Sequence, residues 1–240
     1  MSKIILVHGA FNELWGPHEL HSRWAPAVQD GLWHHGVSVD PADISVCFYG
    51  DLFRLDLRTL DREAWREHKA GAEDLLENVA GDRMLDQLGQ AAGEATLQRT
   101  VHLMAILDRD PDLFEKARSR LAELVTHETR VVVAHSLGTI IAYRTLVANA
   151  GLDVHTFVTL GSPLGNSMVG DFGGTWPGSV QKWVNVAAEG DMLARPHRLA
   201  DIYGDRVEDY LVDNGHRAHS PEPYLNSRPT GAALARALTG

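Results

Sequence analysis

The sequence predicts an α/β protein: a doubly wound, mostly parallel sheet with helices on both faces. Short apolar runs rich in Val and Ile recur along the 240 residues, and most do not alternate with polar residues. Such runs are typical of strands that are buried on both faces of a parallel sheet. Helical stretches separate several of the runs, as crossovers between parallel strands require.

The elements follow one another in a regular order. The six predicted strands are Ile4–Val7, 44–49, 130–134, 156–160, 183–187 and Val207–Val212. Helices are predicted over 25–34, 137–149 and 230–238, the second closed by Gly151 as a C-cap and the third following Pro229. At this length, we expect one domain spanning residues 1–240.

Residues 51–129 interrupt this alternation, because they contain no convincing strand. The pattern predicts helices over 62–79, 83–107 and 112–127, and the last is an ordinary crossover into the strand at 130. The rest is longer than a crossover needs. We therefore expect a helical insertion over 52–108, before the strand at 130, and interpret it as a possible lid over a site. The alternative is a flap that only covers the sheet edge.

The composition narrows the class of partner. The chain has 22 Lys and Arg against 32 Asp and Glu, a formal net charge of -10, which disfavours nucleic acid and anionic membranes as partners. Its one cysteine, Cys47, makes no intrachain disulfide. No apolar run approaches the ~20 residues of a membrane span, and no signal peptide precedes Lys3. We expect a cytoplasmic protein.

Residues 130–144 carry the motif most informative about chemistry. A buried strand runs into Ser136 and a helix begins at once, with the small residues Ala134 and Gly138 at the two flanking positions of a G-x-S-x-G nucleophile elbow. A turn this sharp needs small residues there, because the helix packs against the strand. Ser136 is therefore predicted to be a nucleophile at a helix N-terminus. The alternative is a serine that merely lies near a helix N-cap.

The strand Ile4–Val7 ends in His8-Gly9-Ala10. Acyl transfer passes through an oxyanion that needs two preorganised donors. We expect these to be the N–H groups of Leu137 and Ala10, with Phe11 as second choice to Ala10. His8 is interpreted as structural, its ring holding this loop. Phe11 and Trp15 follow the loop and are predicted to bind substrate by lining an acyl pocket.

These motifs carry a family resemblance. The stretch 6–10, the elbow at Ser136, Leu-Gly-Ser-Pro at 160–163 and a late Asp followed by His stand in the order of the α/β-hydrolase superfamily, which the chain resembles over most of its length. Segments 183–191 and 213–219 resemble small actinobacterial serine hydrolases whose substrates are mostly unassigned. The resemblance implies the hydrolase fold with a short N-terminus, lacking the family's first two antiparallel strands. The insertion precedes the elbow helix, whereas many members carry their lid later.

A nucleophilic serine needs an orienting acid. Asp191 follows the strand 183–187 and a Gly190 turn, which puts it at the same sheet edge as Ser136. It is the predicted acid, and the rivals are Asp171, Asp201 and Asp205.

The base must come after the last strand, where His216 and His219 qualify. The resemblance favours His219, as does its place at the start of the loop that leads into the terminal helix.

Together these residues predict a cofactor-free serine hydrolase, carboxylesterase-like or lipase-like, that cleaves a small-molecule ester or acyl substrate through an acyl-enzyme. A peptidase, thioesterase or acyltransferase with the same triad is the alternative, as is a non-catalytic hydrolase-fold binding protein. No metal is expected, since no Cys or carboxylate pattern supports the histidines 18, 21, 34 and 35. The apolar face of 83–107 predicts that the insertion shapes an apolar acyl pocket; the alternative is that this face fills an interface.

Overall fold

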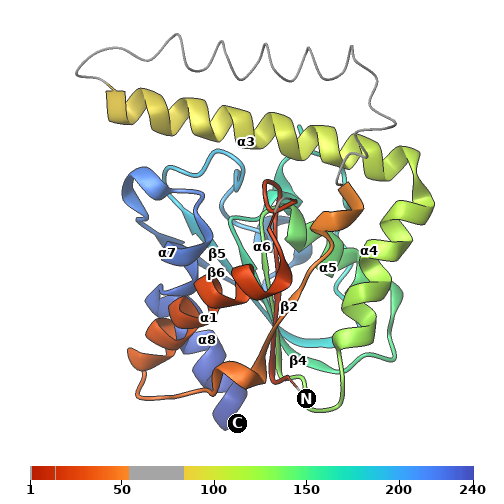
Figure 1. Ribbon diagram of the computed structural model, residues 1–240, viewed down its shortest axis with the longest axis vertical. Helices are drawn as coiled ribbons and strands as arrows, with labels where there is room; N and C mark the ends of the chain where they lie inside the picture. The colour runs from red at the N-terminus through yellow and green to blue at the C-terminus, as the bar shows by residue number, and fades with distance from the viewer. Residues whose placement is uncertain (1, 14, 54–83) are drawn as a thin grey trace.

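The computed structural model describes residues 2–13, 15–53 and 84–240. Its centre is a six-stranded sheet in the order β2-β1-β3-β4-β5-β6, in which every pair of neighbours is parallel (Figure 1). The strands are β1 (Ile4–Val7), β2 (Ile44–Cys47), β3 (Val131–His135), β4 (Val154–Leu160), β5 (Val180–Ala188) and β6 (Val207–Val212). The predicted α/β class and parallel sheet are confirmed.

Helices cover both faces of the sheet. One face carries α1 (Pro17–Trp33), α7 (Pro221–Leu225) and α8 (Arg228–Thr239); the other carries α4 (Pro111–Leu124), α5 (Leu137–Ala148) and the end of α3 (Met84–Arg109). Short elements complete the described chain: α6 (Ala200–Tyr203) and the 3-10 turns η1 (Pro41–Asp43), η2 (Gly50–Phe53), η3 (Pro163–Gly165) and η4 (Gly215–Arg217).

The alternation of side chains along β1 explains the two layers. Ile4 and Leu6 pack in the core beneath α1, whereas Ile5 and Val7 pack in the core beneath α5, and all four are fully buried. Successive strand residues point to opposite faces, so a strand that is apolar throughout requires cover on both sides.

The first helix differs most from the expectation. α1 begins at Pro17, with Gly16 as N-cap, rather than at residue 25, and Pro26 lies inside it. An interior proline removes one helical hydrogen bond and usually breaks a helix. The helix continues through it because Leu20, Trp24 and Val28 are all buried against the sheet.

Part of the predicted insertion is described. The helices predicted over 83–107 and 112–127 are present as α3 and α4, separated by the N-cap Asp110, while the helix predicted over 62–79 lies outside the described residues. α3 runs across the carboxyl edge of the sheet (Figure 1) and contacts η4. Its residues Leu103, Met104 and Leu107 are buried in the core with α5, so this part of its apolar face fills an interface.

None of the helices within the described ranges is long and apolar enough to cross a membrane.

Candidate active site

The parallel sheet brings the predicted residues to one edge. His8 follows β1, Ser136 follows β3, and Asp191 and His219 come after β5 and β6. The register pairs Val7 with Ala134 and His135 with Leu160, so the ends of β1, β3 and β4 are level. The carboxyl ends of neighbouring parallel strands are where open α/β sheets place their sites.

Ser136 lies in a strained turn between β3 and α5. Its φ is 56° and its ψ is −130°, in a region that non-glycine residues rarely occupy. Glycines make room for the turn: a Cβ on Gly138 would lie 2.3 Å from the carbonyl oxygen of His8, and one on Gly9 would lie 2.6 Å from the Cβ of Ser136. This is the close packing for which the elbow motif needs small residues.

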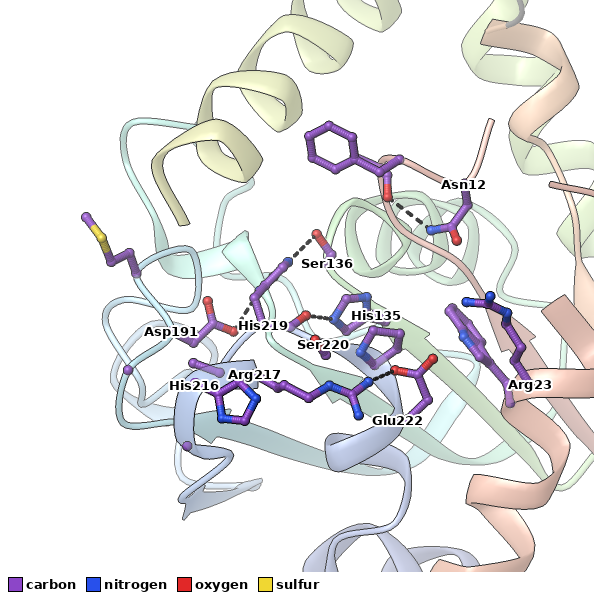
Figure 2. Close-up of a pocket in the computed structure, with 18 of the residues that line it drawn as sticks. Asn12, Arg23, His135, Ser136, Asp191, His216, Arg217, His219, Ser220 and Glu222 are labelled. Atoms are coloured by element: carbon purple, nitrogen blue, oxygen red, sulfur yellow. Dashed lines mark hydrogen bonds and ion pairs between the residues drawn. The ribbon is translucent and has the colours of Figure 1, made fainter. Parts of the chain in front are cut away.

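His219 joins Ser136 to Asp191 (Figure 2). Its Nε2 lies 2.9 Å from Ser136 Oγ and its Nδ1 lies 2.7 Å from Asp191 Oδ2. Because a carboxylate only accepts hydrogen bonds, Nδ1 carries the proton and Nε2 is left to accept one from the serine. The three residues predicted from sequence thus form one continuous hydrogen-bonded chain.

The rival candidates lie outside this chain. His216 is exposed on η4 and lines the cavity, whereas the hydrogen bonds to Ser136 and Asp191 come from His219. Asp171, Asp201 and Asp205 are all exposed, and Asp201 pairs with Arg198.

Asp191 is buried yet well supplied with donors. Oδ1 accepts from the N–H groups of Leu193 (3.0 Å) and Ala194 (3.4 Å). Oδ2 accepts from His219 and from the hydroxyl of Tyr224, which lies 2.6 Å away. Burial alone would raise the pKa of Asp191, but the charge of His219 and the hydrogen bonds from His219 and Tyr224 hold that pKa below its usual value. The carboxylate is therefore ionised at neutral pH.

Sequence reasoning missed His135, the residue before Ser136. Its Nε2–H donates to the carbonyl oxygen of His219 (2.9 Å), and the two ring centroids are 4.8 Å apart. Burial, followed by the neighbouring His219, lowers the pKa of His135 to about 3, so its ring is neutral. A neutral ring that anchors the His219 backbone fixes the position of His219. The place of His135 directly before Ser136 is the one sequence signal for this role.

The predicted oxyanion loop is braced from two sides. The Nδ1–H of His8 donates to Gly9 O (2.8 Å) while its Nε2 accepts from Tyr49 N–H (3.1 Å), the structural role expected of His8. The side-chain amide of Asn12, not singled out from sequence, donates to the carbonyls of Gly9 and Ala10, each at 3.0 Å. With both carbonyls turned toward Asn12, the loop's backbone is held in one conformation.

The predicted oxyanion donors Leu137 and Ala10 both belong to the surroundings of Ser136. Leu137 is the first residue of α5, so its N–H has no carbonyl partner within the helix. Ala10 and Phe11 line the cavity from the opposite loop, and Phe11 has a left-handed φ of 64°.

A cavity of about 1060 Å³ opens beside Ser136. Phe11 and Trp15 line it, as predicted for substrate contacts, and the guanidinium of Arg23 stacks 3.8 Å from the centre of the Trp15 ring. The described part of the lining mixes apolar and charged side chains. Its charged members among the described residues are Arg23, Arg195, Arg217, Glu94, Asp191 and Glu222. The predicted apolar acyl pocket also rests on side chains of α3 at 84–93, which lie outside the described ones. Glu94 is the contribution of α3 among its described side chains, because the apolar residues farther along α3 pack in the core.

Comparisons with known proteins do not assign the chain to a family. The chain matches no protein-family model. No curated protein matches it either.

Proposed function

We propose that the protein is a serine hydrolase of the α/β-hydrolase type that cleaves carboxylic esters. The observation that carries the proposal is the hydrogen-bonded chain from Ser136 Oγ through His219 to the buried carboxylate of Asp191. This arrangement activates a hydroxyl that is otherwise too weak a nucleophile at neutral pH. The strained φ of Ser136 supports the proposal, because strain of this kind gathers at functional sites.

In the first half of the proposed reaction, Ser136 Oγ attacks the ester carbonyl and its proton passes to His219 Nε2. Asp191 holds the imidazole tautomer and stabilises the imidazolium that forms. The N–H groups of Leu137 and Ala10 donate to the oxyanion. As the tetrahedral intermediate collapses, the bond to the alkoxide breaks and His219 returns the proton to it, which releases the alcohol and leaves an acyl-serine.

In the second half, His219 Nε2 takes a proton from water as the water oxygen attacks the acyl carbon. Collapse of this second intermediate breaks the bond to Ser136 Oγ, which regains its proton from His219. The acid leaves and the enzyme returns to its starting state.

The cavity indicates the kind of ester. Three arginines and the aromatic side chains of Phe11 and Trp15 share the lining. Arg217 pairs with Glu222 at 2.7 Å and Arg23 stacks on Trp15, and a long hydrocarbon chain would remove water from these charged groups without offering them a hydrogen bond. We therefore infer a small-molecule ester with polar substituents rather than a long plain acyl chain.

The helix α3 supports the lid interpretation. It contacts η4, which precedes His219, and its Arg99 pairs with Glu13 near the oxyanion loop at 3.1 Å. A helix joined to both sides of the cavity can exclude water from the acyl-enzyme, apart from the attacking molecule.

A fluorophosphonate probe tests the proposal, because it reacts covalently only with an activated serine. We expect the wild-type protein to be labelled and to hydrolyse p-nitrophenyl acetate, and Ser136→Ala to lose labelling and about 10^6-fold in turnover. Ser179→Ala is the matched control, because this buried serine donates to Leu146 O, away from the site. An unlabelled wild-type protein, or a Ser136→Ala variant with a tenth of the activity, contradicts the proposal.

A further inference from the structure

The hydroxyl of Tyr224 makes two hydrogen bonds, one of them to Asp191, the proposed acid. It lies on α7, and its ring is fully buried. Its hydroxyl donates to Asp191 Oδ2 at 2.6 Å and accepts from the N–H of Ala188 at 2.9 Å. Ala188 is the last residue of β5. The tyrosine oxygen therefore bridges the rigid end of a central strand and the carboxylate that follows it.

We propose that Tyr224 is a positioning residue of the proposed hydrolase, which orients Asp191 and sets how much of its negative charge reaches His219. The inference rests on the proposed function, since it gives Tyr224 a part in that reaction. The residue acts through Asp191 and His219 and does not touch the reacting atoms.

The geometry at Oδ2 gives the physical reason. Two donors, His219 Nδ1–H and the Tyr224 hydroxyl, share this one oxygen. A hydrogen bond to a charged acceptor draws charge toward its donor and is about twice as strong as a neutral one. The hydrogen bond from Tyr224 therefore weakens the electrostatic attraction between Asp191 and a protonated His219. It also stops the carboxylate from rotating away from the ring.

Tyr224 remains a donor over the whole working range of pH. Burial, followed by the neighbouring negative charge of Asp191, raises the pKa of its phenol well above the usual value. The backbone N–H of Ala188 occupies an acceptor site of the hydroxyl oxygen, which leaves the phenolic proton directed to Asp191.

The other ionisable groups around His219 must be held constant in any test. The ring of His135, at the end of β3, lies tilted beside that of His219, and Asp191 bonds to His219 Nδ1 while Tyr224 bonds to Asp191. Among the described residues, the other charged or titratable groups that line the same cavity are Arg23, Glu94, Arg195, His216, Arg217 and Glu222. Replacing Tyr224 with phenylalanine removes one oxygen and changes none of these.

The test compares Tyr224→Phe with Tyr203→Phe. Tyr203 is also buried, and its hydroxyl donates to the backbone carbonyl of Leu164 (3.2 Å), so it controls for the loss of a tyrosine hydrogen bond. For Tyr224→Phe we expect kcat to fall about 10-fold with little change in KM. We also expect the acidic limb of the kcat/KM profile, which reports the pKa of His219, to move up by about 0.5 to 1 unit.

NMR titration of His219 provides a second readout that needs no substrate. The pKa of His219 should rise in Tyr224→Phe and stay at the wild-type value in Tyr203→Phe. If Tyr224→Phe fails to fold, 3,5-difluorotyrosine incorporated at position 224 provides the opposite perturbation. Its hydroxyl is a stronger donor, so the pKa of His219 should fall.

The outcomes separate this inference from the proposed function. A wild-type protein labelled by the fluorophosphonate, with a Tyr224→Phe variant that keeps its kcat and its pKa for His219 and loses only stability, would show that Tyr224 is structural and overturn the inference alone. A wild-type protein that is neither labelled nor active overturns the proposed function and, with it, the role of Tyr224.

Discussion

Gly161 lies directly against the carboxylate of Asp191. A Cβ at position 161 would stand 2.8 Å from Asp191 Oδ2 and 3.2 Å from His219 Nδ1, and the residue has a φ of 54°. Both the space and the backbone conformation therefore exclude a side chain at the end of β4. The absence of a side chain at Gly161 therefore lets Asp191 and His219 approach each other closely.

This relationship predicts the effect of Gly161→Ala. The added methyl group should push Asp191 and His219 apart and lower kcat/KM at least 100-fold, because a misplacement of about 1 Å can cost that much. Strain at positive φ should also cost about 1–3 kcal/mol of stability. Gly151→Ala is the control, since nothing lies within 4 Å of a Cβ there. Wild-type kinetics in Gly161→Ala would show that this contact is unimportant.

Replacing the two late histidines should separate their roles. His219→Ala removes the proposed base and should be about as damaging as loss of the serine, close to 10^6-fold in kcat. His216→Ala should keep most of the turnover, because His216 lines the cavity without joining the hydrogen-bonded chain. Steady-state kinetics of both variants with p-nitrophenyl acetate decides the assignment. The reverse pattern would make His216 the base.

Acid should destabilise the protein through two buried histidines. Burial, opposed by weaker hydrogen-bond and charge effects, lowers the pKa of His8 to about 4, and burial together with His219 lowers that of His135 to about 3, from an ordinary value of 6.5. Because the folded state disfavours the protonated rings, their contribution to stability is complete above pH 6.5 and is lost as the pH falls toward 4. Each ring contributes a slope of up to about 1.4 kcal/mol per pH unit in this window.

Urea unfolding between pH 7.5 and 4.5 measures this slope, and His135→Gln should reduce it. Asp191 does not interfere, because its lowered pKa puts its own loss of stability below pH 3.8. A free energy of unfolding that stays flat over the window, or an unchanged slope in His135→Gln, would contradict the prediction.

The ion pair between Arg99 and Glu13 should couple α3 to the loop that follows Ala10. The pair is mostly buried, with side chains 20% and 11% exposed. A double-mutant cycle with Arg99→Gln and Glu13→Gln should give a coupling energy of about 1 kcal/mol in thermal or urea unfolding. The exposed pair Arg198–Asp201 is the control, and surface pairs of this kind couple by about 0.5 kcal/mol or less. Equal coupling in both pairs would mean that α3 is not anchored here.

Local patterns were enough to predict the strands and the tight turn at Ser136. The strand before Ser136, the small residues Ala134 and Gly138 and the helix after them are neighbours in the chain, so short-range sterics fix the turn. Asp191 was found because a residue just beyond a parallel strand lies at the carboxyl edge of the sheet. These predictions needed only the period of the strands and the size of residues.

Expectations about larger packing were less successful. The apolar pattern of α3 predicted a buried face, and Leu103, Met104 and Leu107 bury theirs in the core. The side chains at 84–93, on which the acyl-pocket prediction also rests, lie outside the described ones. A periodic pattern shows that a helix face is buried and cannot show what it is buried against. The start of α1 was predicted late for a related reason, since the packing that carries the helix through Pro26 is tertiary.

What the sequence by itself determined is the parallel α/β sheet and the serine at its edge, because both follow from contacts between residues close in the chain. Only the tertiary structure placed His219 rather than His216 beside Ser136 and Asp191, and only it joined His135 to the carbonyl of His219 and Tyr224 to the carboxylate of Asp191. The residues bonded in these last two pairs are 84 and 33 positions apart in the sequence. Hydrogen bonds over such separations leave no periodic trace in a sequence, since the path of the folded chain alone brings their atoms within 3 Å.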